Sequence, residues 1–68
     1  MSLKEIVEQT CKEQQVKLED LFIGEWVGDG LPVFPEFADE MLETHSNKEV
    51  VNSLYLEDSK LLVVVFNN

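Results

Sequence analysis

Apolar residues recur at intervals of three and four near the start of the chain, which is the spacing of one helix face. The residues with this spacing are Leu3, Ile6, Val7, Thr10 and Cys11. Ser2 lies just before this run and Glu5 lies three residues later, which is the spacing of a capping box. In a capping box each side chain accepts a hydrogen bond from the other residue's backbone N–H. The pattern predicts a first helix that ends at about Gln15.

Residues 21 to 34 show a different pattern, with short aromatic and β-branched runs on either side of Gly28-Asp29-Gly30. Glycine and aspartate tolerate the positive φ of tight hairpin turns, so the segment predicts a β-hairpin. Gly24 is a candidate for a bulge. Pro32 has no N–H to donate, which places the second strand at a sheet edge.

The first strand of this hairpin has two partly apolar faces. Phe22 and Trp26 share one face, and Leu21, Ile23 and Val27 share the other. One face covers the core and the other contacts a helix or a partner. Trp26 is therefore either a core residue or, if exposed, a strong interface anchor.

A second helix is predicted from Pro35, a residue well suited to a first helical turn, to about His45. Its apolar stripe is formed by Phe37, Ala38, Met41 and Leu42. The next residues, 46 to 53, are compatible with helix or strand, because Ser46 and Glu49 repeat the capping-box spacing. We expect a short helical turn near residues 47 to 52.

The last third of the chain predicts a second hairpin, with strands around Leu54-Tyr55-Leu56 and from Lys60 to Phe66. Leu61 to Phe66 is continuously apolar, as in a strand that is covered on both faces. At an open edge such a strand pairs with other chains. Either a strand flanks it on each side, or two copies meet there in a homodimer.

These elements predict a single α+β domain over residues 1–68, in the order α-β-β-α-(short helical turn)-β-β, with the helices packed on one face of an antiparallel sheet. A domain of this size buries only about 60% of its unfolded surface. The core is therefore small, and self-association is one ordinary way to reinforce it.

Charge is concentrated in the middle of the chain. The formal net charge is −9, from 14 acidic residues and 5 lysines. Eight acids and no lysine or arginine lie between Lys17 and Lys48, namely Glu19, Asp20, Glu25, Asp29, Glu36, Asp39, Glu40 and Glu43. The last four have the spacing i, i+3, i+4, i+7, which places them in one stripe on the second helix. Four like-charge pairs in such a stripe cost about 1–2 kcal/mol in total.

No residue pattern indicates catalysis or a bound cofactor. Cys11 fits the apolar stripe of the first helix, where cysteine packs as a small hydrophobe. His45, the only histidine, fits a helix C-terminus, where its protonated form interacts favourably with the helix dipole. The Gly28-Asp29-Gly30 segment lacks the spacing of a phosphate or calcium loop, and the acids of the second helix have no histidine partner for a metal. We expect no enzyme, no cofactor and no metal.

The acidic stripe suggests a function in protein binding. We expect a small acidic protein that docks on a basic surface of a partner and inhibits or masks it, with contacts from Glu36, Asp39, Glu40, Glu43, Glu25, Asp29 and Trp26. A nucleic-acid-binding protein or nuclease is a natural target, as for phage inhibitors or antitoxins, because the charge spacing along the stripe resembles that of DNA phosphates. The alternative is a homodimeric regulatory or structural subunit, joined through Leu61 to Phe66, whose acidity only serves solubility.

The composition also narrows the partner and the compartment. The chain has no arginine cluster or basic patch for phosphates, so we expect no direct nucleic-acid binding. No apolar run approaches the roughly 18 residues of a membrane span, and acids interrupt the first segment, so we expect neither a membrane span nor a signal peptide. A single unpaired cysteine agrees with a cytoplasmic protein.

Overall fold

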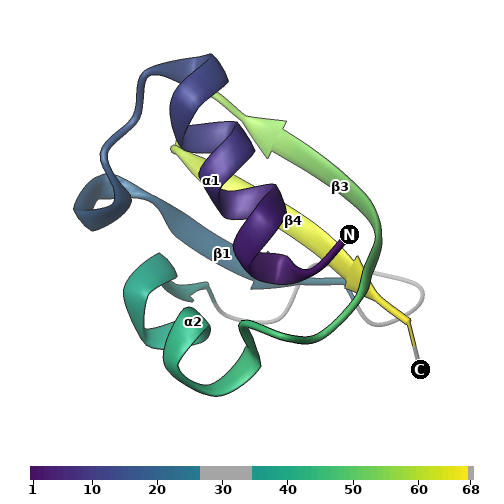
Figure 1. Cartoon of the computed structure of the whole chain (residues 1–68). Helices are drawn as coiled ribbons and strands as arrows, with labels where there is room; N and C mark the ends of the chain where they lie inside the picture. The colour runs from purple at the N-terminus through teal and green to yellow at the C-terminus, as the bar shows by residue number, and fades with distance from the viewer. Residues whose placement is uncertain (27–34, 68) are drawn as a thin grey trace.

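Two α-helices lie on one face of a four-stranded sheet (Figure 1). The structure is a computed structural model, and it describes residues 1–26 and 35–67. The elements are α1 (Leu3–Gln14), the 3-10 helix η1 (Leu18–Asp20), β1 (Phe22–Glu25), β2 (Glu36–Phe37), α2 (Ala38–His45), β3 (Val50–Leu56) and β4 (Leu61–Phe66). The predicted α+β class and element order are confirmed, apart from the short helical turn.

The sheet is mixed, whereas the sequence predicted an antiparallel one. Its strand order is β2-β1-β4-β3. The outer strands β2 and β3 each pair antiparallel with an inner neighbour, but β1 and β4 run parallel at the centre. Parallel neighbours need a long crossover between them. The chain between β1 and β4 supplies it by way of β2, α2 and β3.

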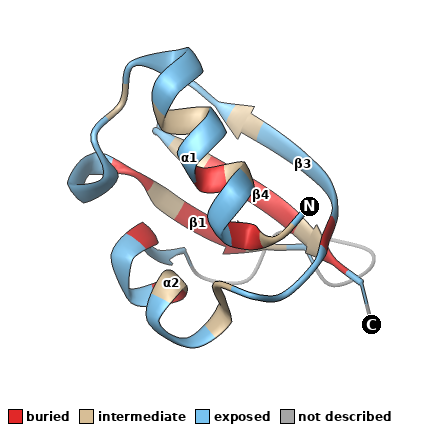
Figure 2. Ribbon diagram, in the orientation of Figure 1, coloured by how far each residue is buried: buried red, intermediate tan, exposed pale blue. Residues whose placement is uncertain are grey.

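The core lies between the helices and the sheet, and Figure 2 shows buried segments on α1, α2, β1 and β4. The buried apolar side chains are Leu3, Val7, Leu21, Ile23, Ala38, Met41, Val50, Leu62, Val64 and Phe66. β4 has β1 on one side and β3 on the other, so the prediction of a central strand is confirmed. The edges of β4 are thus paired within one chain, which is the first of the two alternatives for this strand.

The first helix matches its prediction. The hydroxyl of Ser2 accepts a hydrogen bond from the Glu5 N–H at 3.3 Å, and the Glu5 carboxylate accepts one from the Ser2 N–H at 3.0 Å. At the other end Gln15 takes a left-handed conformation, with φ of 55°. The capping box and the apolar spacing therefore define α1 at both ends from local sequence.

The second helix begins three residues later than predicted. Glu36 and Phe37 form β2, which pairs with Ile23 and Phe22 of β1. The N–H of Ala38 then donates to the Leu21 carbonyl at 2.9 Å. These bonds to β1 hold the backbone of Glu36 and Phe37 extended, so Pro35 does not start a helix.

The prediction of a short helical turn near residues 47 to 52 is wrong. A turn follows α2, with the Lys48 N–H bonded to the His45 carbonyl at 3.0 Å, and β3 already begins at Val50. Pairing of Val50 with Phe66 draws this segment into the sheet. The second hairpin is confirmed as β3 and β4, but β3 is longer than the predicted strand.

The first hairpin is only partly within the described residues. β1 is present, and its antiparallel neighbour β2 lies at the edge of the sheet. The expected turn at Gly28-Asp29-Gly30, the strand around Pro32 and residue Val27 lie outside the described residues. The short η1 helix before β1 was not predicted.

Candidate partner-binding surface

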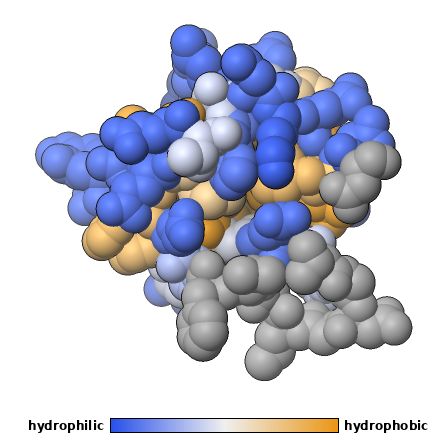
Figure 3. Space-filling model, turned by 90° about the horizontal axis from the view of Figure 1, so that it is seen from below, coloured by the Kyte–Doolittle hydropathy of each residue, from blue (hydrophilic) through white to orange (hydrophobic). Residues whose placement is uncertain are grey.

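The predicted acidic stripe is divided between two elements. Asp39, Glu40 and Glu43 are exposed on α2, while Glu36 is exposed on β2. Figure 3 views the molecule from the side on which α2 lies, and hydrophilic side chains cover much of this face with hydrophobic surface between them. The four acids thus remain neighbours along the chain, but only three share a helix face.

An aromatic pair lies at the start of this acidic segment. The rings of Phe22 and Phe37 have centroids 5.0 Å apart and are tilted by 31°. Such a distance is typical of a favourable aromatic contact. Phe22 is half-buried, whereas Phe37 remains 49% exposed and stands between Glu36 and the acids of α2 in the sequence. The sequence had placed Phe37 in the apolar stripe of the helix, and this is corrected by its position in β2.

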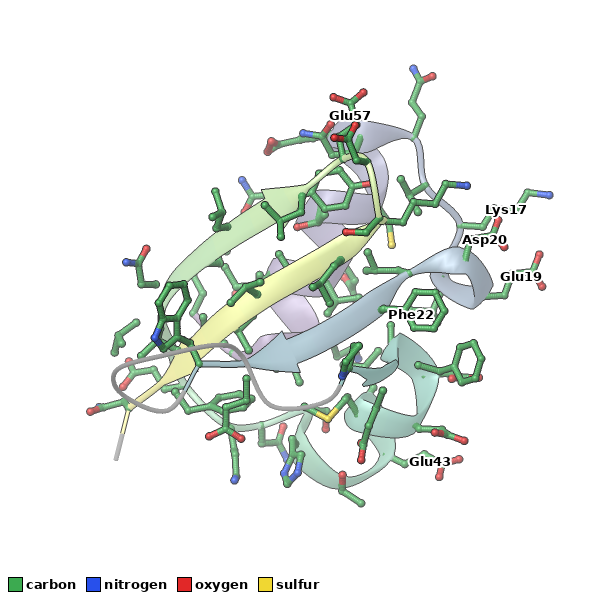
Figure 4. All side chains as sticks on the ribbon, turned by 180° about the vertical axis from the view of Figure 1, so that it is seen from behind. Lys17, Glu19, Asp20, Phe22, Glu43 and Glu57 are labelled. Carbon is green, nitrogen blue, oxygen red and sulfur yellow. The ribbon has the colours of Figure 1, made fainter. Side chains whose placement is uncertain are left out.

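Two more acids lie close to α2, on the short helix η1 that precedes β1. Glu19 and Asp20 are exposed on η1, which packs against α2. Figure 4 shows the labelled Glu19, Asp20 and Glu43 on the same side of the molecule as Phe22. The sequence predicted a first helix that ends at about Gln15, and it assigned Glu19 and Asp20 to no element of their own. Their proximity to α2 depends on η1, for which the sequence offered little signal beyond Leu18 and Leu21.

We call these residues together the acidic-aromatic surface: Glu19, Asp20, Glu36, Phe37, Asp39, Glu40 and Glu43. Lys17 lies at its border, beside Asp20 in Figure 4. Among the described residues no lysine approaches a carboxylate within the 4.0 Å of an ion pair. The carboxylates of this surface are therefore available to a basic partner.

The other predicted contact residues lie elsewhere. Trp26 is 42% exposed and lies on the face of the sheet opposite the helices, where it lines a shallow groove with Leu54, Val63 and Val65. Glu25 is half-buried at the end of β1. Asp29 lies outside the described residues. Trp26 shares a face of β1 with Phe22, the partner of Phe37, but lies beyond the opposite end of that strand.

A groove of about 730 Å³ separates α1 from η1 and α2. Its residues are Val7, Cys11, Leu18, Leu42, Ser46, Lys4, Glu8 and Lys12. Partial burial in this groove raises the pKa of the Cys11 thiol. A thiol with a raised pKa forms less of the reactive thiolate, which agrees with a packing role for Cys11.

His45 ends α2, as predicted, and packs inward. Its ring centroid is 6.0 Å from that of Phe66, and its Nδ1 is buried without a hydrogen-bond partner among the described residues. The Lys48 ammonium lies 5.2 Å from the same Phe66 ring. His45 therefore packs beside Phe66 at the border of the core and does not face the acidic-aromatic surface.

The described residues contain no group of three or more His, Cys, Asp or Glu side chains arranged for a metal ion. Within the same residues, no helix has the length and apolar character needed to cross a membrane. Comparisons with known proteins found no matching family model, no matching curated protein and no matching solved structure.

Proposed function

We propose that this chain is a small non-enzymatic binding protein that docks its acidic-aromatic surface on a basic surface of a partner protein and thereby inhibits or masks it. The observation that carries the proposal is Phe37, a half-exposed ring in contact with Phe22 that lies between Glu36 and the acids Asp39 and Glu40 in the sequence. Exposed aromatic rings are characteristic centres of protein interfaces.

The chemistry of this surface fits an arginine or lysine side chain of the partner. A cation over the face of Phe37 is attracted by the ring quadrupole. The exposed carboxylates of α2 accept charge-assisted hydrogen bonds from cations of the partner, in a bidentate manner from arginine. The remaining acids increase the association rate through charge complementarity.

A protein that itself binds nucleic acid is the favoured target class. Asp39 to Glu43 rise about 6 Å along the helix, so their three charges are spaced comparably to phosphates at about 3.4 Å along one DNA strand. On this proposal, the chain acts as an inhibitor of the kind found in phages or antitoxin systems. It places the chain in the cytoplasm, where a free thiol such as Cys11 stays reduced.

The test is affinity capture from an extract of the organism that encodes the chain, treated with nuclease so that nucleic acid cannot bridge, and eluted with rising salt. A variant with Glu36, Glu40 and Glu43 changed to Gln and Asp39 to Asn loses the partner at lower salt. The matched control changes Glu8, Glu13 and Glu57 to Gln and Asp58 to Asn, which removes the same charge from exposed sites elsewhere. Equal retention of the partner by both variants contradicts the proposal.

Phe37→Leu separates the ring from its apolar bulk. It keeps an apolar side chain but removes the quadrupole, so we expect weaker binding of the captured partner in a titration of the purified proteins. DNA that competes with the chain for the partner supports the favoured target class. Unchanged affinity of Phe37→Leu shows that the ring is not the centre of the contact.

A further inference from the structure

The outer strand β3 exposes an uncharged edge. Its seven residues, Val50–Leu56, include no charged residue and no proline. Val51 is 58% exposed, Leu54 56% and Leu56 40%. Natural proteins protect edge strands with charges, prolines or covering segments, because an unprotected edge pairs with other strands. β3 lacks the first two of these, and its one irregularity, between Val50 and Asn52, lies near its beginning.

A covering segment, residues 1–3, protects only the beginning of β3. The Val50 N–H donates to the Met1 carbonyl at 2.7 Å, the Leu3 N–H donates to the Lys48 carbonyl at 2.9 Å, and Ser2 forms an isolated bridge with Glu49. No described residue pairs with the outer edge of β3 from Asn52 to Leu56. This part of the edge is open.

One hydrogen bond shows which backbone groups point outward. The Ser53 N–H donates at 2.9 Å to the side-chain oxygen of the preceding Asn52, and the carbonyl of Val64, opposite Ser53 in β4, accepts from the Trp26 N–H on the other side of β4. Groups alternate along a strand, so Ser53 and Tyr55 present their N–H and C=O to the open edge, while Asn52, Leu54 and Leu56 bond β4.

We propose that two copies of this chain associate through β3, which pairs antiparallel with β3 of the second copy about a two-fold axis at Leu54. The two four-stranded sheets thereby become one continuous sheet of eight strands. Leu54 faces Leu54 of the second copy, and Ser53 exchanges both hydrogen bonds with Tyr55 of the second copy. The contact is independent of the acidic-aromatic surface, which lies at the opposite edge of each sheet.

Three features of the structure determine this register. An axis between two residues pairs the outer face of one strand with the inner face of the other, so the axis must pass through a residue. At Ser53 it would bring Leu56 of the second copy to Val50, whose edge Met1 already holds. At Tyr55 it would leave only Leu54 to Leu56 paired strand to strand. An axis at Leu54 gives a ladder from Asn52 to Leu56 that includes neither Val50 nor Val51, next to which the register is irregular.

The uncharged ladder allows a second copy to be the occupant. The chain carries a net charge of −9, so contacts that bring acidic surfaces of two copies together are repulsive. The ladder from Asn52 to Leu56 has no charged residue. The nearest acid, Glu57, falls opposite the uncharged Val51 of the second copy. Two acidic chains therefore pair along β3 without setting carboxylates opposite each other.

The first test measures the molar mass of the purified chain by sedimentation equilibrium over a range of concentrations. We expect a monomer–dimer equilibrium that Ser53→Pro shifts to monomer, because proline removes the outward N–H and leaves the bonds to β4 intact. Leu54→Lys, which sets two lysines opposite each other, raises the dimer dissociation constant about tenfold. Gln9→Lys adds the same charge on exposed α1 and leaves the equilibrium unchanged. Circular dichroism confirms that each variant is folded.

The second test examines the register in a Cys11→Ser background. A non-hydrogen-bonded antiparallel pair has Cα atoms about 4.5 Å apart, within the range of a disulfide. With oxidised glutathione as the oxidant, Leu54→Cys forms a disulfide-linked dimer. Asn52→Cys and Leu56→Cys do so only when the two are mixed. A monomer at all concentrations, a dimer unaffected by Ser53→Pro and Leu54→Lys, or cross-linking without this pattern overturns the proposal.

Discussion

The two α-helices of this chain begin in different ways. α1 starts at its own capping box, with Ser2 and Glu5 satisfying each other's backbone N–H groups. α2 has no side-chain cap at Phe37, and the first N–H of the helix instead bonds the Leu21 carbonyl beside β1. The start of α1 is therefore set by residues within one turn, and the start of α2 by a contact with Leu21, seventeen residues earlier in the chain.

The two helices also differ in the pattern of their charges. On α1, Lys4, Glu8 and Lys12 alternate in sign at a spacing of four. On α2, Asp39, Glu40 and Glu43 are all acidic and no lysine is interleaved. Because Glu36 is in β2, two like-charge pairs remain on the helix, at a cost of about 0.4–1 kcal/mol. The acidic-aromatic surface is therefore less costly to stability than the sequence alone indicated.

The largest expected effect on stability comes from a test of whether capping or packing maintains α1. A helix of twelve residues is marginal in water even with good capping, so α1 depends on the burial of Leu3. We expect Leu3→Ala to lower the free energy of unfolding by about 2–5 kcal/mol, measured by urea denaturation. Ser2 and Glu5 remain in this variant. A loss below about 1 kcal/mol would mean that capping, not packing, maintains α1.

Phe22→Ala tests whether the aromatic pair sets the start of α2. We expect a loss of about 1–3 kcal/mol, since a half-buried ring and its contact with Phe37 are removed. Glu36 and Phe37 should then leave β1 and join the helix, as their spacing favours. Backbone NMR chemical shifts of these two residues report the change. Phe22→Leu, which keeps most of the apolar contact, is the control, and an unchanged helix start in Phe22→Ala contradicts the explanation.

Ser2→Ala removes the cap of α1. We expect a loss of about 1 kcal/mol in the free energy of unfolding, the usual value for an N-cap serine. Ser2→Asp restores an acceptor for the Glu5 N–H and should recover most of it. Thermal or urea unfolding of the three proteins gives the comparison, and equal stability of Ser2→Ala and the wild type would show that the cap is redundant with tertiary packing.

The same substitution should have opposite effects on the two helices. Glu43→Lys converts two repulsive pairs with Asp39 and Glu40 into attractive ones, so we expect a gain of about 0.5–1 kcal/mol. Glu8→Lys places a lysine between Lys4 and Lys12, and we expect a loss of similar size. Urea denaturation at low and high salt measures both. Effects of the same sign, or effects that salt does not reduce, would exclude charge patterning as the cause.

The smallest effect concerns pH. Hydrogen bonds from the backbone N–H and then the hydroxyl of Ser2 hold the pKa of Glu5 below its ordinary value of 4.5. A carboxylate with a depressed pKa in the folded state adds stability above the ordinary value, and this stability is lost as the pH falls through the folded pKa. We therefore expect the stability difference between the wild type and Glu5→Gln to shrink as the solution is acidified below pH 4.5. A constant difference contradicts this linkage.

The acidic composition could be recognised from the sequence, but the surface that it forms could not. Asp39, Glu40 and Glu43 were predicted to share a helix face, and they do. Glu36 was misplaced because its spacing fits a helix and its pairing with Ile23 leaves no local signal. Glu19 and Asp20 come close to α2 only through the packing of η1. Spacing along the chain cannot reveal neighbours of that kind.

Local sequence was sufficient to predict α1, the central apolar strand β4 and the hairpin that contains it. In each of these the signal and the structure lie within a few residues of each other: a capping box, an uninterrupted apolar run, and a turn between two runs. Contacts between distant segments produce the parallel pairing of β1 with β4, the extended backbone of Glu36 and Phe37, and the strand conformation of Val50. Those features depend on hydrogen bonds between distant segments, and a strong local preference yields to them when the distant partner can satisfy the backbone and bury the side chain.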